Sequence, residues 1–201
     1  MNNAIRAQQA AAAGMAGALL WLLSVLMQTL FGLETGASTG PLYLAHQAVA
    51  FLAMGLIGYG YLGIAWGGGV VNRFGRVSTA LVGLGYGLVI AGGILALILG
   101  NGADSPLFLL FPLGGLLTAL GVLFSGIAVA RAGSWRGWQR WVPLLYAAFL
   151  WLAVEIPLVA GLTDGPGMWG ELGMGVGLFL VALGTSTAAG AKTVAARPAG
   201  Q

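Results

Sequence analysis

The chain has 201 residues, of which 59% are hydrophobic and only 6% are charged, against about 25% charged residues in a typical water-soluble domain. This composition excludes a soluble globular domain and indicates an integral membrane protein with a single transmembrane domain over residues 1–201. Cysteine is absent, which excludes disulfides, a thiolate nucleophile and cysteine-ligated metals. The net charge of +3 does not indicate nucleic acid, because its distribution follows membrane topology.

Six apolar segments are long enough to cross a bilayer, which takes about 20 helical residues. After a short alanine-rich leader, the predicted spans are residues 14–33, 42–66, 77–100, 106–130, 141–162 and 166–190. The first is longer than the roughly 7–15 apolar residues of a secretory signal and has no clear cleavage site, so we expect a retained helix. The predicted fold is an all-α bundle of six transmembrane helices.

The positive charges all fall on one side of this arrangement. With the N-terminus inside, the inner segments hold Arg6, Arg73, Arg76, Arg131, Arg136, Arg140, Lys192 and Arg197, which are all the basic residues of the chain. The outer turns hold Glu34, Asp104 and Asp164 and no basic residue. By the positive-inside rule, we expect both termini in the cytoplasm. We also expect a multi-pass protein of a bacterial-type plasma (inner) membrane.

A weak repeat follows the outer turns. Each turn has an acid, then a proline, then an unusual residue five or six positions into the next helix; these last residues are His46, Pro112 and Glu171. The repeat indicates three helical hairpins of one design, all inserted the same way up. Pro112 is also a candidate helix break, because a proline inside a helix removes a backbone hydrogen bond.

Glycine accounts for 36 of the 201 residues, far above the usual ~7%. In a membrane bundle, glycine allows helices to approach closely. Small residues recur at four-residue spacing in the pairs Gly63/Gly67, Gly83/Gly87, Gly121/Ser125 and Gly173/Gly177. We expect these faces to pack within the bundle, or to bind a second copy or a membrane-complex partner.

The loop before the fifth span, RAGSWRGWQRW, alternates arginine with tryptophan. Both residue types anchor helices at the membrane–water interface, and each basic residue contributes about 1 kcal/mol of attraction to anionic headgroups. We therefore predict contact with membrane lipid for Arg131, Trp135, Arg136, Trp138, Arg140 and Trp141.

The fifth span carries a carboxylate, Glu155, two residues before Pro157. A charged side chain in hydrocarbon costs at least ~2.5–3.5 kcal/mol, so Glu155 is a candidate functional group. Pro157 has no N–H to donate to the carbonyl of Ala153, so we expect it to break the helix and to free a backbone acceptor near the acid.

Counting about 1.5 Å per residue from the outer helix ends places His46, Glu155 and Glu171 at a similar depth, with Glu34 at the mouth above them. An outward-facing site around Glu155 suits a proton- or cation-coupled carrier, which is the function we favour. Alternatively, these groups are structural in a non-catalytic membrane subunit or scaffold. In a third interpretation, the protein is a membrane enzyme in which His46, Glu155 and Glu171 hold a divalent metal, or in which His46 holds a haem. No catalytic residue and no particular cofactor is predicted.

The topology has a direct test. A reporter fused after Ser105 should lie outside the cell and one fused after Ser134 should lie in the cytoplasm, because the charge pattern places these loops on opposite sides of the membrane. Alkaline phosphatase activity reports the first location and fluorescence of a green fluorescent protein the second. Two reporters on the same side would contradict the six-span order.

Overall fold

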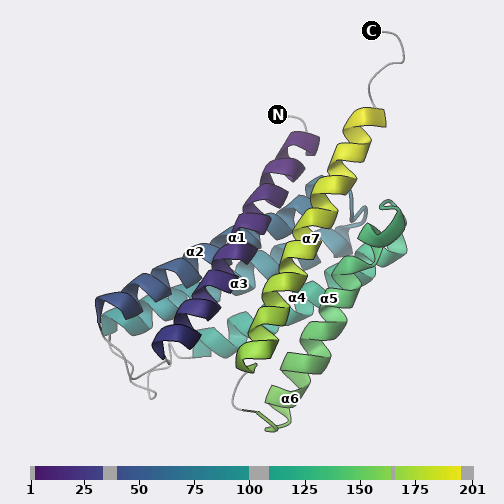
Figure 1. The fold of residues 1–201 in the computed structure, drawn as a ribbon. Helices are drawn as coiled ribbons and strands as arrows, with labels where there is room; N and C mark the ends of the chain where they lie inside the picture. Colours follow the sequence, from purple (N-terminus) through teal and green to yellow (C-terminus); the bar gives the residue numbers. More distant parts are fainter. Residues whose placement is uncertain (1–2, 34–39, 100–108, 164–165, 196–201) are drawn as a thin grey trace.

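The computed structural model describes residues 3–33, 40–99, 109–163 and 166–195, with side chains up to Ala191, and the regular structure in these ranges is helical (Figure 1). Its elements are α1 (Asn3–Phe31), α2 (Pro41–Trp66), α3 (Arg73–Leu99), α4 (Leu110–Ala132), the 3₁₀ turn η2 (Gly137–Arg140), α5 (Val142–Leu150), the π-helical turn η3 (Trp151–Glu155), α6 (Ile156–Val159) and α7 (Gly167–Ala195). Six helical stretches are long and apolar enough to cross a membrane, and α5, η3 and α6 together form the fifth. The chain is a multi-pass membrane protein with six spans.

The first helix begins at Asn3 rather than near Gly14, so the described residues of the predicted leader are part of the first helix. Ala7, Ala10 and Ala11 lie in this stretch and are fully buried. A methyl side chain allows close contact between helices, so this alanine-rich segment packs in the bundle instead of preceding it. The other described helix ends lie within five residues of the predicted ones.

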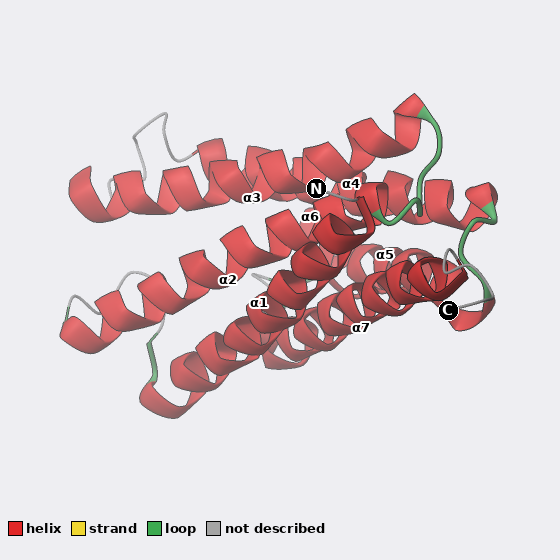
Figure 2. Cartoon of the chain, turned by 90° about the horizontal axis from the view of Figure 1, so that it is seen from above, coloured by secondary structure: helices red, strands yellow, loops and turns green. Residues whose placement is uncertain are grey.

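The six spans contact one another in a closed ring. α1 packs on α2, α2 on α3, α3 on α4, α4 on α5 and α5 on α7, and α7 returns to α1 (Figures 1 and 2). The most extensive contacts join α1 to α2, α3 to α4 and α1 to α7. The first two are antiparallel pairs that correspond to predicted hairpins. The pair predicted as the third hairpin, α5 with α7, is looser, because α7 lies chiefly against α1.

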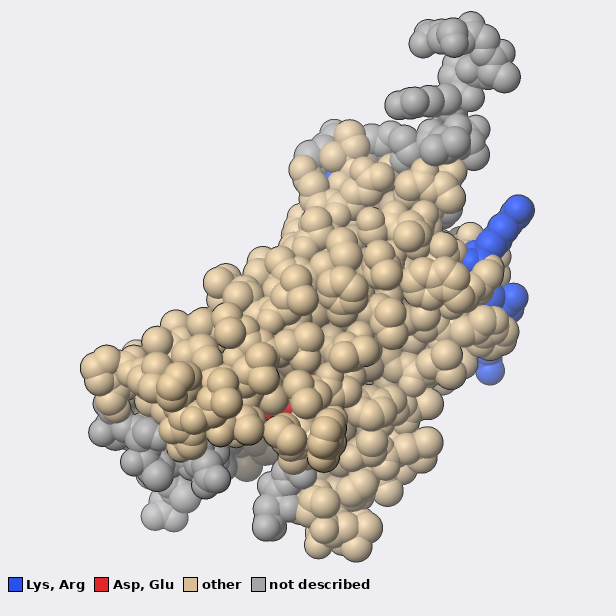
Figure 3. Space-filling model, in the orientation of Figure 1, with Lys and Arg blue, Asp and Glu red and all other residues tan. Residues whose placement is uncertain are grey.

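Charge is distributed unevenly between the two ends of the bundle. Both termini lie at the same end (Figure 1), as an even number of spans requires. In the face shown in Figure 3, the basic side chains of the described residues lie toward that end, and the visible acidic surface is a small recessed patch toward the other end. Among the residues whose side chains are described, the carboxylates are Glu155 and Glu171.

Glycines bring the backbones of α1 and α2 into direct contact. A Cβ atom added to Gly60 would lie 2.6 Å from the Cα atom of Gly14, and one added to Gly17 would lie 2.8 Å from the carbonyl oxygen of Ala53. No side chain fits at such distances, so only glycine permits this approach.

Three of the four predicted small-residue pairs face other helices inside the bundle. Gly63 and Gly67 lie against Ala7 and Ala10 of α1, Gly121 lies against Ser78 and Val82 of α3, and Gly173 and Gly177 lie against the rings of Phe149 and Tyr146 of α5. Gly87 differs, because a Cβ atom added there would meet no atom within 4 Å. The face that carries Gly87 is therefore open.

The tryptophans of the loop before α5 divide into two kinds. Trp138 and Trp141 are 47% and 48% exposed, and the Arg140 guanidinium lies 5.1 Å from the centroid of the Trp141 ring, a cation–π contact. Trp135 is only 2% exposed and its ring packs on Gly69. The prediction that Trp135 anchors the chain in lipid is wrong, because its indole belongs to the protein core. Lipid contact by the other five residues of this loop stays a prediction.

Valine at Gly60 should push α1 away from α2, because its side chain has no room beside Gly14. Overpacking of this kind costs about 1–3 kcal/mol, which should lower the midpoint of thermal unfolding, measured by circular dichroism in detergent. Gly87→Val is the matched control, since it makes the same change inside a helix with open space beside it. Equal midpoints for the two variants would contradict a tight crossing at Gly60.

Candidate functional site

The fifth span changes helix type where it carries the acid. α5 ends at Leu150, and the next five residues form the π-helical turn η3, in which the Ile156 amide donates to the Trp151 carbonyl. α6 follows, with Pro157 in its first turn. The proline ring would clash with the carbonyl of Ala153, four residues earlier, and a wider turn relieves this clash. Pro157 thus shapes the segment that presents Glu155.

Pro112 has no comparable effect. It lies in the first turn of α4, which begins at Leu110. The first N–H groups of a helix have no partner within the helix, so a proline there costs no hydrogen bond. The helix break predicted at Pro112 is therefore absent from α4 as described.

Glu155 lines a central cavity of about 140 Å³ that touches all six spans. A cavity of this size holds several water molecules or a small ligand. The side chains that give it chemical character come from different helices and include Trp21, Met54, Tyr86, Thr118, Tyr146 and Met174. Within the described residues, Glu155 is the one ionisable carboxylate in this lining.

Several polar groups around this cavity have no partner in the protein. The Thr118 hydroxyl is buried without a hydrogen bond, and so is the Tyr61 hydroxyl nearby. Tyr86 and Tyr146 line the cavity with Glu155, and both belong to the same packed cluster as Tyr61. The Glu155 carboxylate accepts no hydrogen bond from the described residues. A buried polar group without a partner costs about 1–3 kcal/mol, so the cavity suits water or a ligand that supplies partners.

His46 lies between two helices rather than in this cavity. Its side chain is 5% exposed, and its Nε2 atom shares a hydrogen bond of 3.0 Å with the Ser24 hydroxyl of α1. Its Nδ1 atom is buried without a partner. His46 does not line the central cavity. Its hydrogen bond to Ser24 joins α2 to α1.

Glu171 is connected to the cavity only through its backbone. It lies near the start of α7, is half-buried, and its carbonyl oxygen accepts a hydrogen bond of 3.2 Å from Trp21 Nε1. Trp21 also lines the cavity, but the side chain of Glu171 does not. Trp21 thus holds α7 against α1 at the cavity wall.

The three residues predicted to share a site do not form a metal centre. In the described ranges of the chain, no group of three or more His, Asp or Glu side chains is placed to hold a metal ion. Glu34, predicted at the mouth of the site, lies outside the described residues, as do Asp104 and Asp164.

Sequence reasoning missed the aromatic and hydroxyl groups of the cavity. Tyr86 and Tyr146 carried a usable signal, because tyrosine in a membrane protein normally lies at the interface, whereas both line the central cavity of the bundle. Thr118 carried no comparable signal, since single hydroxyls are common in transmembrane helices.

Neither protein-family models, nor curated proteins, nor solved structures show a match to this chain. The geometry of the site is thus the basis for its functional interpretation.

Alanine at Ser24 should leave both ring nitrogens of His46 buried without a protein partner. The expected loss of unfolding free energy is about 1–3 kcal/mol, measured by thermal unfolding in detergent. Thr29→Ala is the control, because the Thr29 side chain is exposed and bonds only to the Val25 carbonyl of its own helix. A Ser24→Ala protein as stable as the parent would show that this hydrogen bond does not hold α1 to α2.

Proposed function

We propose that this protein is a small carrier that moves protons or a small cation across the membrane, with Glu155 as the group that binds the ion. The observation that carries the proposal is the position of Glu155 on a cavity that all six spans line. Ionisable residues that face the interior of a membrane bundle mark ion and proton pathways. A carboxylate turned toward the centre of a helix ring fits this pattern.

The surroundings of Glu155 suit a cation. The carboxylate supplies negative charge and accepts no hydrogen bond from the described residues that a bound ion would have to displace. Trp21, Tyr86 and Tyr146 line the same cavity, and the faces of aromatic rings attract cations. The Thr118 hydroxyl has a free lone pair for coordination. A bound proton or cation would neutralise the carboxylate inside the bundle.

The fifth span also offers a place for movement. The contact between α5 and α7 is the least extensive in the ring, and η3 interrupts the regular hydrogen bonding of this span. π-helical turns and prolines are common causes of helix bending. We propose that bending at η3 moves α6 relative to α7 and opens the cavity, with the end that carries the termini facing the cytoplasm.

The other two interpretations have less support. A scaffold that docks through glycine faces would need those faces free, yet three of the four predicted pairs pack inside the bundle. An enzyme with a metal held by His46, Glu155 and Glu171 would need these side chains together, and the described residues contain no such group.

The test is ion flux in liposomes that contain the purified protein and an internal pH-sensitive dye. A potassium gradient with valinomycin imposes a membrane potential, and proton entry is read from the dye; sodium and potassium gradients are tested with matching indicators. Glu155→Gln should abolish the flux, because glutamine keeps the shape of the side chain but neither ionises nor binds a proton at neutral pH. Glu171→Gln is the matched control and should retain at least half of the parent flux.

The comparison requires that both variants elute and unfold like the parent protein. If Glu155→Gln conducts as the parent does, Glu155 is not the binding group. If protons, sodium and potassium all enter liposomes with the parent protein no faster than they enter empty liposomes, the carrier proposal is wrong.

A further inference from the structure

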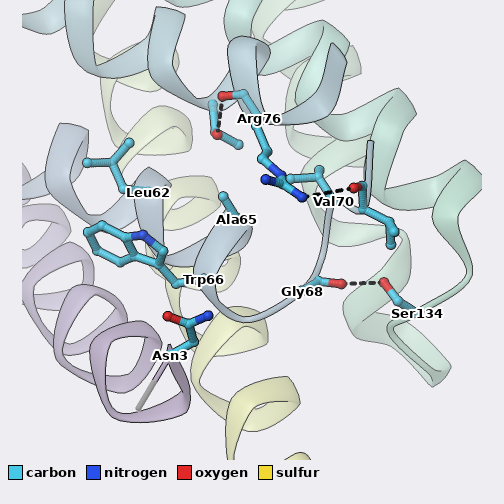
Figure 4. A pocket seen from close by; sticks show the side chains of 10 residues that line it. Asn3, Leu62, Ala65, Trp66, Gly68, Val70, Arg76 and Ser134 are labelled. Carbon is cyan, nitrogen blue, oxygen red and sulfur yellow. Dashed lines mark hydrogen bonds between the residues drawn. The ribbon is translucent and has the colours of Figure 1, made fainter. Parts of the chain in front are cut away.

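A second cavity, of about 610 Å³, lies at the end of the bundle that carries the termini (Figure 4). Asn3 of α1, Trp66 of α2 and Arg76 of α3 line it, together with the loop that joins α2 to α3. Arg76 donates to the Val71 carbonyl oxygen at 3.4 Å, and the Ser134 hydroxyl donates to the Gly68 carbonyl oxygen at 2.6 Å. These bonds hold the loop that forms the cavity wall.

A groove of about 390 Å³ continues from this cavity along the bundle, between α2 and α3. Leu62 lines both spaces, so they lie next to each other. Glycines are prominent in the groove lining, and beside Gly87 there is no atom within 4 Å of an added Cβ position. At the junction, the ring of Tyr59, which lines the groove, packs edge-on against the ring of Trp66, which lines the cavity, with centroids 5.7 Å apart.

Charge and length define what fits this combined space. Arg76 is the one charged side chain in the described lining, and no carboxylate lines either the cavity or the groove. From Trp66, which lines the cavity, to Gly55, which lines the groove, the combined space follows α2 over eleven helical steps, about 16 Å at the helical rise of 1.5 Å. Half of the hydrocarbon core of a bilayer measures about 15 Å. The combined space therefore has a cationic end and an apolar groove, and its length along α2 is about that of a single leaflet.

We propose that one anionic phospholipid binds here, with its phosphate at Arg76 and one acyl chain in the groove between α2 and α3. Asn3 and the Trp66 indole lie at the headgroup end and can donate hydrogen bonds to phosphate or glycerol oxygens. The lipid belongs to the leaflet on the side of the termini, where it meets the groove by lateral diffusion. A transmembrane helix of a partner protein would fill the apolar groove but would leave Arg76 without an anion.

Native mass spectrometry from a mild detergent tests the headgroup. Phosphatidylglycerol and phosphatidylcholine with the same acyl chains are added in equal amounts, and the parent should retain one phosphatidylglycerol per chain in preference to phosphatidylcholine. Arg76→Gln should lower the ratio of the two retained lipids about five-fold, the factor that matches ~1 kcal/mol per basic residue. Arg73→Gln is the control, because Arg73 is exposed at the same end of α3 but does not line the cavity.

A second pair of variants tests the acyl-chain groove. Leucine at Gly87 should fill the groove without a clash inside the protein, and it favours the helix relative to glycine. Gly87→Leu should therefore reduce retention of both lipids. Ala148→Leu adds a leucine on an exposed face of α5 away from the groove and should leave retention unchanged.

Three results would overturn the proposal. Equal losses in Arg73→Gln and Arg76→Gln would show that only general surface charge attracts the lipid. Parent-like retention by Gly87→Leu would show that no acyl chain lies in the groove. A dimer or a bound partner protein, lost in Gly87→Leu and free of lipid, would assign the groove to a protein contact. Because the readout is lipid retention and not ion flux, the result is independent of the carrier proposal.

Discussion

The spacing of α1 and α2 depends on Gly14 and Gly60, where the two backbones are in direct contact. In a bilayer, helices gain no hydrophobic free energy by associating, so close van der Waals packing must hold them together. α1 is central to this packing because it lies against both α2 and α7 and so closes the ring. The central cavity depends on that closure, since Trp21 of α1 and Met54 of α2 form a section of its wall.

Small and large residues have complementary places in the ring. Gly173 and Gly177 of α7 leave room for the rings of Phe149 and Tyr146, so that Tyr146 reaches the cavity. Tyr146 shares this cavity with Glu155, the carboxylate at the end of the π-helical turn. The polar groups of the central cavity thus depend on the π-helical turn of the fifth span and on the glycines of α7 that pack against α5.

The two proposed sites share some of their lining while differing in charge. The central cavity contains Glu155, and the space at the other site contains Arg76. Met54 and Tyr86 line both the central cavity and the groove between α2 and α3. A lipid chain in the groove would therefore contact side chains that also border the proposed ion site, and lipid composition could in this way affect the proposed transport.

The sequence alone determined the number, order and approximate length of the helices, because a membrane span must satisfy its own backbone hydrogen bonds and match the bilayer thickness. It also determined the charge difference between the two ends and the irregularity near Pro157, which are local properties. Counting residues predicted a similar depth for His46 and Glu155 but no direction for either side chain, and the structure turns His46 toward Ser24 and Glu155 toward the central cavity. Only the tertiary structure decided which side chains meet, because the rotation of each helix about its axis is set jointly by the packing of all its neighbours.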